Sequence, residues 1–267
     1  MRYTERLVDY VLDTKYDKVP AEVINQTKIC IMDSIGCTLG GFQTTLGKNV
    51  VKVFKELGGK GNSTIIGDGG KTNCVQAAYT NSYLCNLLDY DDTYNGMGHP
   101  NDTIVPPALS VGEEAHVSGR EYLTAVVLGY EVSIRIGLAI WPSLERTKKI
   151  ALPIPPWQTF GSVVAAGKLL GLSRTELVDA FGIAGNYAPL SVKITGRPLN
   201  IKDGKVAQAS ANGVLAALLA RAGIVGDRRV LDKEAYYWIA AGSDRCDYDK
   251  MVEMLGEKYH IMEIAFK

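Results

Sequence analysis

The sequence has little histidine, little cysteine and no excess of charge of either sign. Its 29 lysines and arginines equal its 29 aspartates and glutamates, so the formal net charge at pH 7 is zero. Proteins that bind nucleic acids by electrostatic attraction carry a basic excess. The charge balance therefore argues against a nucleic acid as partner.

Cysteine and histidine are too few and too scattered for a familiar metal site. The five cysteines are odd in number, irregularly spaced and without a CxxC pair: Cys30, Cys37, Cys74, Cys85 and Cys246. This pattern excludes a disulfide framework and a thiolate metal cluster, and it predicts that the cysteines are small buried hydrophobic residues. With only three histidines in the chain, we expect no zinc site and no other metal.

Long hydrophobic runs are also missing. The longest uncharged apolar run, from Val206 to Ala220, contains Gln208 and Asn212 and is shorter than the ~20 residues that span a bilayer. Residues 1–13 mix acidic and basic side chains, which is not the pattern of a secretory signal. We therefore expect a cytoplasmic protein that does not bind a membrane.

Strand patterns are scarce, and helical periodicity dominates. The only predicted strand is Ser63 to Ile66, and helical spacing of apolar residues covers Glu22 to Gly40, Gly119 to Gly137 and Val206 to Arg221. Strands do not alternate with helices, which disfavours a doubly wound sheet. We predict a single all-α domain over residues 1–267, a large bundle-like assembly of many helices.

Local signals place several helix ends and faces. Ser173 and Glu176 form a capping box after Gly171, which ends the preceding helix, and Gly213 suits a helix that its neighbours approach closely. The first long helix is predicted to bury one apolar face: Ile24, Ile31, Ile35 and Leu39. Long loops are predicted at 90–102, 141–157 and 187–203, where helical proteins commonly place their polar chemistry.

The densest polar cluster lies in the first of these loops. It contains Asp89, Asp91, Asp92, Thr93 and His99. Imidazole exchanges protons near neutral pH, so His99 is a candidate general acid/base that a nearby carboxylate would orient. The structural alternative is that one aspartate caps a helix end, that the others are solvated, and that the histidine precedes a proline in an extended turn.

Two phosphate-related patterns are disfavoured by their context. Asp89-x-Asp91-x-Thr93 matches the DxDxT pattern of haloacid-dehalogenase-like phosphatases, which requires a preceding strand, whereas the preceding apolar residues have helical spacing. Gly70-Lys71-Thr72 is similar to the end of a P-loop, but Ile65 stands where that loop requires glycine. We interpret residues 70–72 as a turn.

A basic cluster precedes the helix that is predicted to begin near Val206. Its members are Lys193, Arg197, Lys202 and Lys205. Cations beside a helix amino terminus reinforce the positive end of the helix dipole and would form a receptor for a carboxylate. The alternative is a solvated basic loop, with Asp203-Gly204 as the turn that enters the helix.

With these residues in view, the chain resembles the MmgE/PrpD family. The likeness is spread over six segments whose order and spacing together are specific: residues 31–37, residues 88–93 with His99-Pro100, residues 118–121, 128–132, 166–172 and 213–220. The resemblance implies a large all-helical domain followed, in the family, by a smaller α/β domain. We expect residues 1–267 to correspond to the helical domain alone, without the α/β domain. It also implies a homodimer and no metal or organic cofactor.

The resemblance assigns roles to residues of both clusters. Asp89, Thr93 and His99 match family residues at the same mutual spacing, and Lys202 matches an active-site lysine. His99 would be the acid/base, Asp89 would orient it, Thr93 would donate a hydrogen bond, and Lys202 would stabilise negative charge on a substrate carboxylate. Lys267 matches a further lysine and would bind substrate.

One position departs from the family pattern. The family often has a histidine before the segment that reads Thr159-Phe160-Gly161 here, and the alignment places Leu152 at that position. A dehydratase or decarboxylase that needs two histidines would lack the second one.

The resemblance implies a cofactor-independent lyase that acts on a small di- or tricarboxylate, most simply a hydro-lyase similar to 2-methylcitrate dehydratase. One alternative is an epimerase or isomerase of an amino- or hydroxy-dicarboxylate. Another is a protein without catalysis: a remnant, or one half of a two-chain enzyme whose separate subunit supplies the α/β domain.

Overall fold

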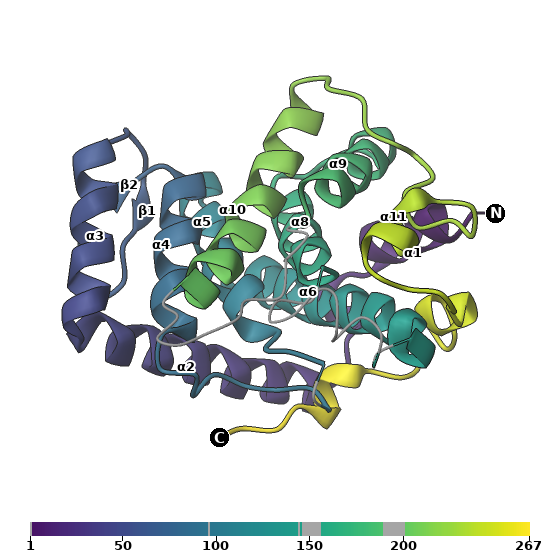
Figure 1. The fold of residues 1–267 in the computed structure, drawn as a ribbon, viewed down its shortest axis with the longest axis horizontal. Helices are drawn as coiled ribbons and strands as arrows, with labels where there is room; N and C mark the ends of the chain where they lie inside the picture. The colour runs from purple at the N-terminus through teal and green to yellow at the C-terminus, as the bar shows by residue number, and fades with distance from the viewer. Residues whose placement is uncertain (1, 96, 144, 146–155, 189–200) are drawn as a thin grey trace.

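Helices form nearly all of the chain that the structure describes. The computed structural model describes residues 2–95, 97–143, 145, 156–188 and 201–267. Its α-helices are α1 (Tyr3–Asp13), α2 (Ala21–Gln43), α3 (Thr45–Leu57), α4 (Cys74–Asn86), α5 (Val105–Ala115), α6 (Gly119–Ile140), α8 (Gln158–Leu169), α9 (Arg174–Tyr187), α10 (Ile201–Arg221) and α11 (Tyr236–Ala240) (Figure 1). Short 3-10 helices are η1 (Tyr16–Lys18), η2 (Asn101–Thr103), η3 (Trp141–Ser143), η4 (Tyr248–Met251) and η5 (His260–Glu263). The prediction of an all-α fold is confirmed.

Two long helices organise the core. Helix α10 packs against α4, α8 and α9, while α6 packs against α8 and crosses α2, which runs along one side of the molecule in Figure 1. The segment 119–143 that contains α6 is long and apolar enough to cross a membrane by length and composition alone. However, 89% of its most apolar stretch is buried inside the protein, as in the core helix of a globular domain.

Helix α10 approaches its neighbours at a glycine, as the sequence predicted. A Cβ atom on Gly213 would clash with the side chain of Ser162 and come within 2.7 Å of the backbone nitrogen of Val163. A glycine therefore lets α10 lie against α8 at a distance that any larger residue would prevent. The predicted capping box of α9 is also present, since Ser173 accepts from the backbone of Glu176 and Glu176 accepts from that of Ser173.

The strand prediction was correct in kind but too long, and the interpretation of 70–72 as a turn was wrong. Strand β1 (Ser63–Thr64) pairs antiparallel with β2 (Lys71–Thr72). Residues 65–70 form the connection, in which the backbone of Ile65 exchanges hydrogen bonds with Gly69 and Gly70. Glycines at this turn supply the backbone freedom that lets so short a hairpin close.

Helix α2 buries only part of the predicted face: Ile24 is buried, Ile31 and Ile35 are partly buried, and Leu39 is 43% exposed. The other buried residues are mostly small or polar and include Thr27, Cys30, Ser34 and Thr38. The threonine hydroxyls donate to backbone carbonyl oxygens one turn earlier, so burying them leaves no polar group unpaired. The spacing of hydrophobic residues alone could not reveal that polar residues of α2 are buried. Of the cysteines, Cys30, Cys74 and Cys85 are buried as predicted, whereas Cys37 and Cys246 are only partly buried.

Candidate functional site

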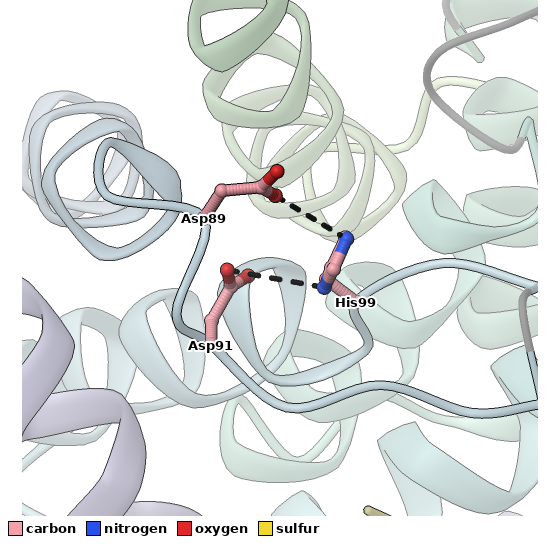
Figure 2. Close-up of side chains that lie close together, drawn as sticks. All are labelled: Asp89, Asp91 and His99. Atoms are coloured by element: carbon pink, nitrogen blue, oxygen red, sulfur yellow. Dashed lines mark ion pairs between the residues drawn. The ribbon is translucent and has the colours of Figure 1, made fainter. Parts of the chain in front are cut away.

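The loop that follows α4 carries most of the candidate residues. Helix α4 ends at Asn86, and the backbone of Asp89 donates back to the Asn86 carbonyl oxygen. Asp89 then adopts a left-handed backbone with φ of 54°, which aspartate tolerates better than most residues. This turn reverses the chain and presents the Asp89 carboxylate above His99, which returns along the same loop (Figure 2).

His99 has a defined orientation. Its Nδ1 lies 2.8 Å from the backbone carbonyl oxygen of Asp92, and its Nε2 lies 3.5 Å from Asp89 Oδ1. Because a carbonyl oxygen only accepts hydrogen bonds, this 2.8 Å contact favours the neutral tautomer that carries its proton on Nδ1 and leaves Nε2 as the basic atom. The ring is 22% exposed and the Asp89 side chain 58% exposed, so a solute can reach both.

Lys202 comes from a distant part of the chain to the same point. Its Nζ donates to Asp89 Oδ1 at 2.6 Å. The prediction that Lys202 lies in a loop before a helix near Val206 was wrong, because α10 begins at Ile201 and includes Asp203 and Gly204. Asp203 in the first turn complements the positive end of the helix dipole, which stabilises an early helix start.

Lys267 also reaches Asp89 and His99. The backbones of Thr93 and Ala265 exchange two hydrogen bonds, at 2.9 and 3.0 Å, as an isolated antiparallel bridge. Two residues beyond the bridge, Lys267 Nζ donates to the Asp89 carbonyl oxygen at 2.8 Å and lies 3.3 Å from His99 Nδ1. The hydroxyl of Thr93 donates to the carbonyl oxygen of Gly98 at 3.3 Å, so its expected contact with a substrate stays a prediction.

A buried clamp holds the segment that carries Lys267. Arg135 on α6 is 1% exposed and donates to the carbonyl oxygens of Glu253, Met254 and Lys258. Its Nε lies 3.4 Å from Glu131, which also accepts from the backbone of Ile261 at 3.0 Å. The clamp thereby fixes the chain before η5 and within it, a few residues ahead of the bridge between Thr93 and Ala265.

Beneath the exposed residues lies a layer of fully buried carboxyl groups. Asp91, Asp92 and Asp102 are 0% exposed. Asp92 accepts from the Tyr130 hydroxyl at 2.7 Å and from the backbone of Asn101 at 3.1 Å, while Asp91 and Asp102 share one amide donor, Asn86 Nδ2. A partly buried fourth carboxylate, Asp33 on α2, accepts from the side chain of Asn101.

The pKa values of these groups separate the two layers. For Asp89, burial acts to raise the pKa, but the hydrogen bond and charge of Lys202, with Lys267 and His99, outweigh it and place the pKa below its ordinary value. Burial raises the pKa of Asp92 to about 8 and that of Asp203 to about 7. Burial, followed by the charge of Asp91, also raises the pKa of Asp33.

Replacing Asp92 with asparagine is expected to change how stability depends on pH. The pKa of Asp92 rises from 3.8 to about 8 on folding, so the folded state binds more protons than the unfolded state between these values. This group therefore makes the free energy of unfolding fall as pH rises through that window. Urea unfolding at several pH values should show a shallower fall for Asp92→Asn than for the parent. Asp17→Asn, at an exposed position, should leave the slope unchanged; an equal slope for Asp92→Asn would contradict the assignment.

Three of these side chains could also approach a metal ion. One ligand atom from each of Asp89, Asp91 and His99 lies within 4.8 Å of the others. However, the ammonium groups of Lys202 and Lys267 lie 2.6 and 3.5 Å from Asp89 Oδ1. A cation at this point would meet two positive charges, so the donor set fits a bound metal poorly. The absence of a metal cofactor stays a prediction.

The structure thus brings Asp89, His99, Lys202 and Lys267 together, with Thr93 holding the adjacent bridge. Leu152, Lys193 and Arg197 lie outside the described residues. A separate cavity of about 540 Å³ is lined by residues that include Lys71, Glu113, His116 and Tyr122, and no candidate residue lines it. The cavity also has a histidine, a lysine and a carboxylate in its lining, so the open cluster is favoured because the residues predicted from the sequence meet there.

Sequence reasoning missed the supporting layer. The sequence patterns assign no role in the site to Asp33, Asp102, Asn86, Asn101 or Gln158. Amide and carboxyl side chains at these positions carry no spacing signal, because they come from four separate segments of the chain. The one signal in the sequence is the number of aspartates around Asp91, because one carboxylate is enough to orient a single histidine.

Comparison with known protein families places most of these residues in one type of domain, which a family model describes. The model of the MmgE/PrpD N-terminal domain matches residues 5–248. The chain belongs to the MmgE/PrpD family. The match covers the helices that position Asp89, His99 and Lys202, and it confirms the family resemblance that the sequence indicated.

Curated relatives in this family are lyases by name. The chain is 29% identical over 242 residues to the cis-aconitate decarboxylase-like protein oryM of Aspergillus oryzae (strain ATCC 42149 / RIB 40), covering 86% of this chain and 49% of that protein. It is 29% identical to cis-aconitate decarboxylase of Homo sapiens (87% and 49% covered) and 25% identical to mitochondrial 2-methylcitrate dehydratase of Yarrowia lipolytica (strain CLIB 122 / E 150; 68% and 36% covered). The chain spans about half the length of the decarboxylases it matches.

Proposed function

We propose that this chain provides the acid/base and carboxylate-binding residues of a lyase that acts on a small di- or tricarboxylate without a cofactor. The observation that carries the proposal is the meeting of two ammonium groups and one imidazole around Asp89, from three separate parts of the chain. Lyase names among MmgE/PrpD relatives support the reaction class.

His99 is the proposed proton-transfer group. Its Nε2, unprotonated in the neutral ring, removes a proton from the carbon next to a substrate carboxylate. The electron pair left behind spreads onto that carboxylate, so negative charge grows there in the transition state. Nδ1 stays hydrogen-bonded to the Asp92 carbonyl oxygen, which holds the ring in place during the transfer.

Lys202 and Lys267 are the proposed partners of the substrate carboxylates. In the free protein, the Asp89 carboxylate makes the 2.6 Å contact with Lys202 that a substrate carboxylate would make. Positive groups at this point stabilise developing charge in a partly dry site more strongly than in water. With Lys202 and Lys267 both within 3.5 Å of Asp89, the pair also suits a substrate that carries more than one carboxylate.

Among lyase reactions, we propose loss of water, as in a hydro-lyase similar to 2-methylcitrate dehydratase. Loss of water requires a second acid for the departing hydroxyl, and either lysine ammonium could supply that proton. Decarboxylation would instead release carbon dioxide and return a proton to carbon. The homodimer, the separate α/β-domain subunit and the cytoplasmic location stay predictions.

Product analysis tests the proposal. The chain is incubated with 2-methylcitrate or with cis-aconitate in deuterated water, and alkene absorbance, carbon dioxide and deuterium incorporation are followed. Alkene formation from 2-methylcitrate supports the hydro-lyase, and carbon dioxide from cis-aconitate supports the decarboxylase. Deuterium incorporation without either product would establish the epimerase instead. Binding without any turnover would point to a chain that needs a second subunit, and neither binding nor turnover would refute the proposal.

Replacing Lys202 with methionine is expected to weaken carboxylate binding. The variant loses a hydrogen bond between charged groups, which contributes about 1.5–3 kcal/mol, so the Kd for citrate or cis-aconitate should rise by about 10- to 150-fold. Isothermal titration calorimetry measures the change. Lys60→Met removes an exposed lysine elsewhere and should alter the Kd by less than about twofold. Equal affinities of Lys202→Met and the parent would remove Lys202 from the site.

A further inference from the structure

We propose that Asp91 and Asp102 form a buried carboxyl pair that shares one proton, in which Asp102 carries the proton and Asp91 is the anion that faces His99. The inference deepens the proposed function, on which its catalytic consequence rests. The pair itself is a property of the folded chain and can be tested without a substrate.

The pair is defined by one shared donor. Asn86 Nδ2 lies 3.1 Å from Asp91 Oδ2 and 3.1 Å from Asp102 Oδ2, which brings the two carboxyl groups side by side. Both side chains are 0% exposed, so water does not screen them from each other. Among the described residues, no lysine or arginine forms an ion pair with either group.

Two adjacent buried carboxyl groups cannot both be ionised at neutral pH. Like charges at this separation in a low dielectric raise the pKa of one partner strongly, as in other carboxyl dyads. Charged groups face the pair from several elements: Asp33 on α2, Asp89 in the loop, Lys202 on α10, and Lys267. Cys85 on α4 and Asp92 in the loop also lie nearby, and burial raises the pKa of both above neutral pH. Burial, followed by the charge and hydrogen bond of Asp91, raises the pKa of Asp102 well above its ordinary value.

Contacts of each partner decide which one keeps the proton. Asp91 Oδ1 is buried, has no hydrogen-bond partner among the described residues, and lies 3.9 Å from His99 Nδ1 (Figure 2). Among the described residues, Asp102 forms no ion pair with the His99 ring, and its Oδ1 lies 3.5 Å from the side-chain amide of Gln158. The partner nearer the imidazole is stabilised as an anion when the ring becomes positive, so the proton stays on Asp102.

The pair would act on His99 rather than on a substrate. When Nε2 takes a proton, the ring becomes an imidazolium, and the Asp91 carboxylate stabilises that charge from the Nδ1 side. The proton on Asp102 donates to Asp91, holds it in place and does not leave during the reaction. Gln158 contacts both Asp102 and the backbone of His99, because its amide also donates to the His99 carbonyl oxygen at 2.7 Å. Asp91 and Asp102 are therefore positioning residues.

Difference infrared spectroscopy of the folded chain at neutral pH tests where the proton lies. Protonated carboxyl groups and carboxylates have separate stretching bands. Subtracting the spectrum of Asp102→Asn from that of the parent should remove a protonated-acid band, and the same subtraction for Asp91→Asn should remove a carboxylate band. Loss of a carboxylate band in Asp102→Asn would overturn the proposal.

Nitrogen NMR of the His99 ring supplies a second readout that a merely structural role would not change. Asp91→Asn should lower the ratio of protonated to neutral His99 at fixed pH by about tenfold or more. Asp102→Asn should leave this ratio close to that of the parent, because an amide still donates to Asp91, whereas Asp102→Leu should lower it as Asp91→Asn does. Equal effects of Asp102→Asn and Asp102→Leu would overturn the proposal.

The two readouts separate this inference from the proposed function. A chain with neither carboxylate binding nor turnover that shows the expected bands and His99 ratios would keep the pair and refute the proposed function. A chain with turnover that lacks the protonated band would keep the lyase and refute the pair. If a variant at Asp91 fails to fold, the infrared comparison of the parent with Asp102→Asn still decides where the proton lies.

Discussion

Replacing His99 with glutamine is expected to lower kcat by about 10²- to 10⁴-fold, the usual contribution of a positioned general acid/base. Glutamine keeps a polar side chain of similar reach but cannot exchange a proton near neutral pH. Because His99 is 22% exposed and its ring makes one hydrogen bond to the backbone, the fold should survive the change. Steady-state kinetics on the substrate found by product analysis, with circular dichroism, measures both effects.

His116→Asn is the matched control for this variant. His116 is a histidine in a left-handed conformation, with φ of 54°, at the end of α5, and asparagine tolerates that backbone. It lines the separate cavity rather than the cluster around Asp89. Its substitution should leave kcat within about twofold. Equal losses of kcat in the two variants would show that His99 has no special catalytic role.

Replacing Arg135 with methionine is expected to destabilise the protein by about 3–5 kcal/mol, because it leaves a buried carboxylate and three carbonyl oxygens without their cation. Those carbonyl oxygens belong to residues 253, 254 and 258, and the carboxylate belongs to Glu131. Urea unfolding measures the loss. Since the clamp positions the segment that ends at Lys267, carboxylate affinity should also fall.

Two further variants separate charge from packing at this clamp. Arg120→Met, on the same helix, loses a cation–π contact with Tyr16 and no ion pair within the part of the chain that the structure describes, so it should change stability by about 1 kcal/mol or less. Adding Glu131→Gln to Arg135→Met should restore part of the stability, because no unpaired buried charge remains. An Arg135→Met variant as stable as the parent would show that the buried arginine contributes nothing to the fold.

The fold was predictable because helical periodicity is a local signal. The spacing of apolar residues gave the helices that became α6 and α10, and the capping box gave the start of α9. The errors have physical causes. In α2, the threonine hydroxyls donate to the backbone of their own helix, and the Ser34 hydroxyl lies 3.4 Å from Cys85 Sγ, so these polar groups are buried with partners. At the start of α10 an acidic first turn outweighs the turn preference of Asp203-Gly204.

The site was predictable only in part. His99 and Asp89 share one loop, so their proximity follows from sequence spacing. The meeting with Lys202 and Lys267 depends on helix packing and on the Thr93–Ala265 bridge, and only the family resemblance indicated it. The buried layer of Asp33, Asp91, Asp92 and Asp102 comes from segments that are distant along the chain, and no pattern in the sequence joins them.

The central claim is that His99 and Lys202 belong to one carboxylate site, and NMR titration with cis-aconitate tests it most directly. The ring nitrogens of His99 and the Nζ of Lys202 should shift together, with one common Kd, and the response of His99 should disappear or weaken strongly in Lys202→Met. Shifts of His116 and Tyr122 in the separate cavity, with His99 and Lys202 unchanged, would contradict the account.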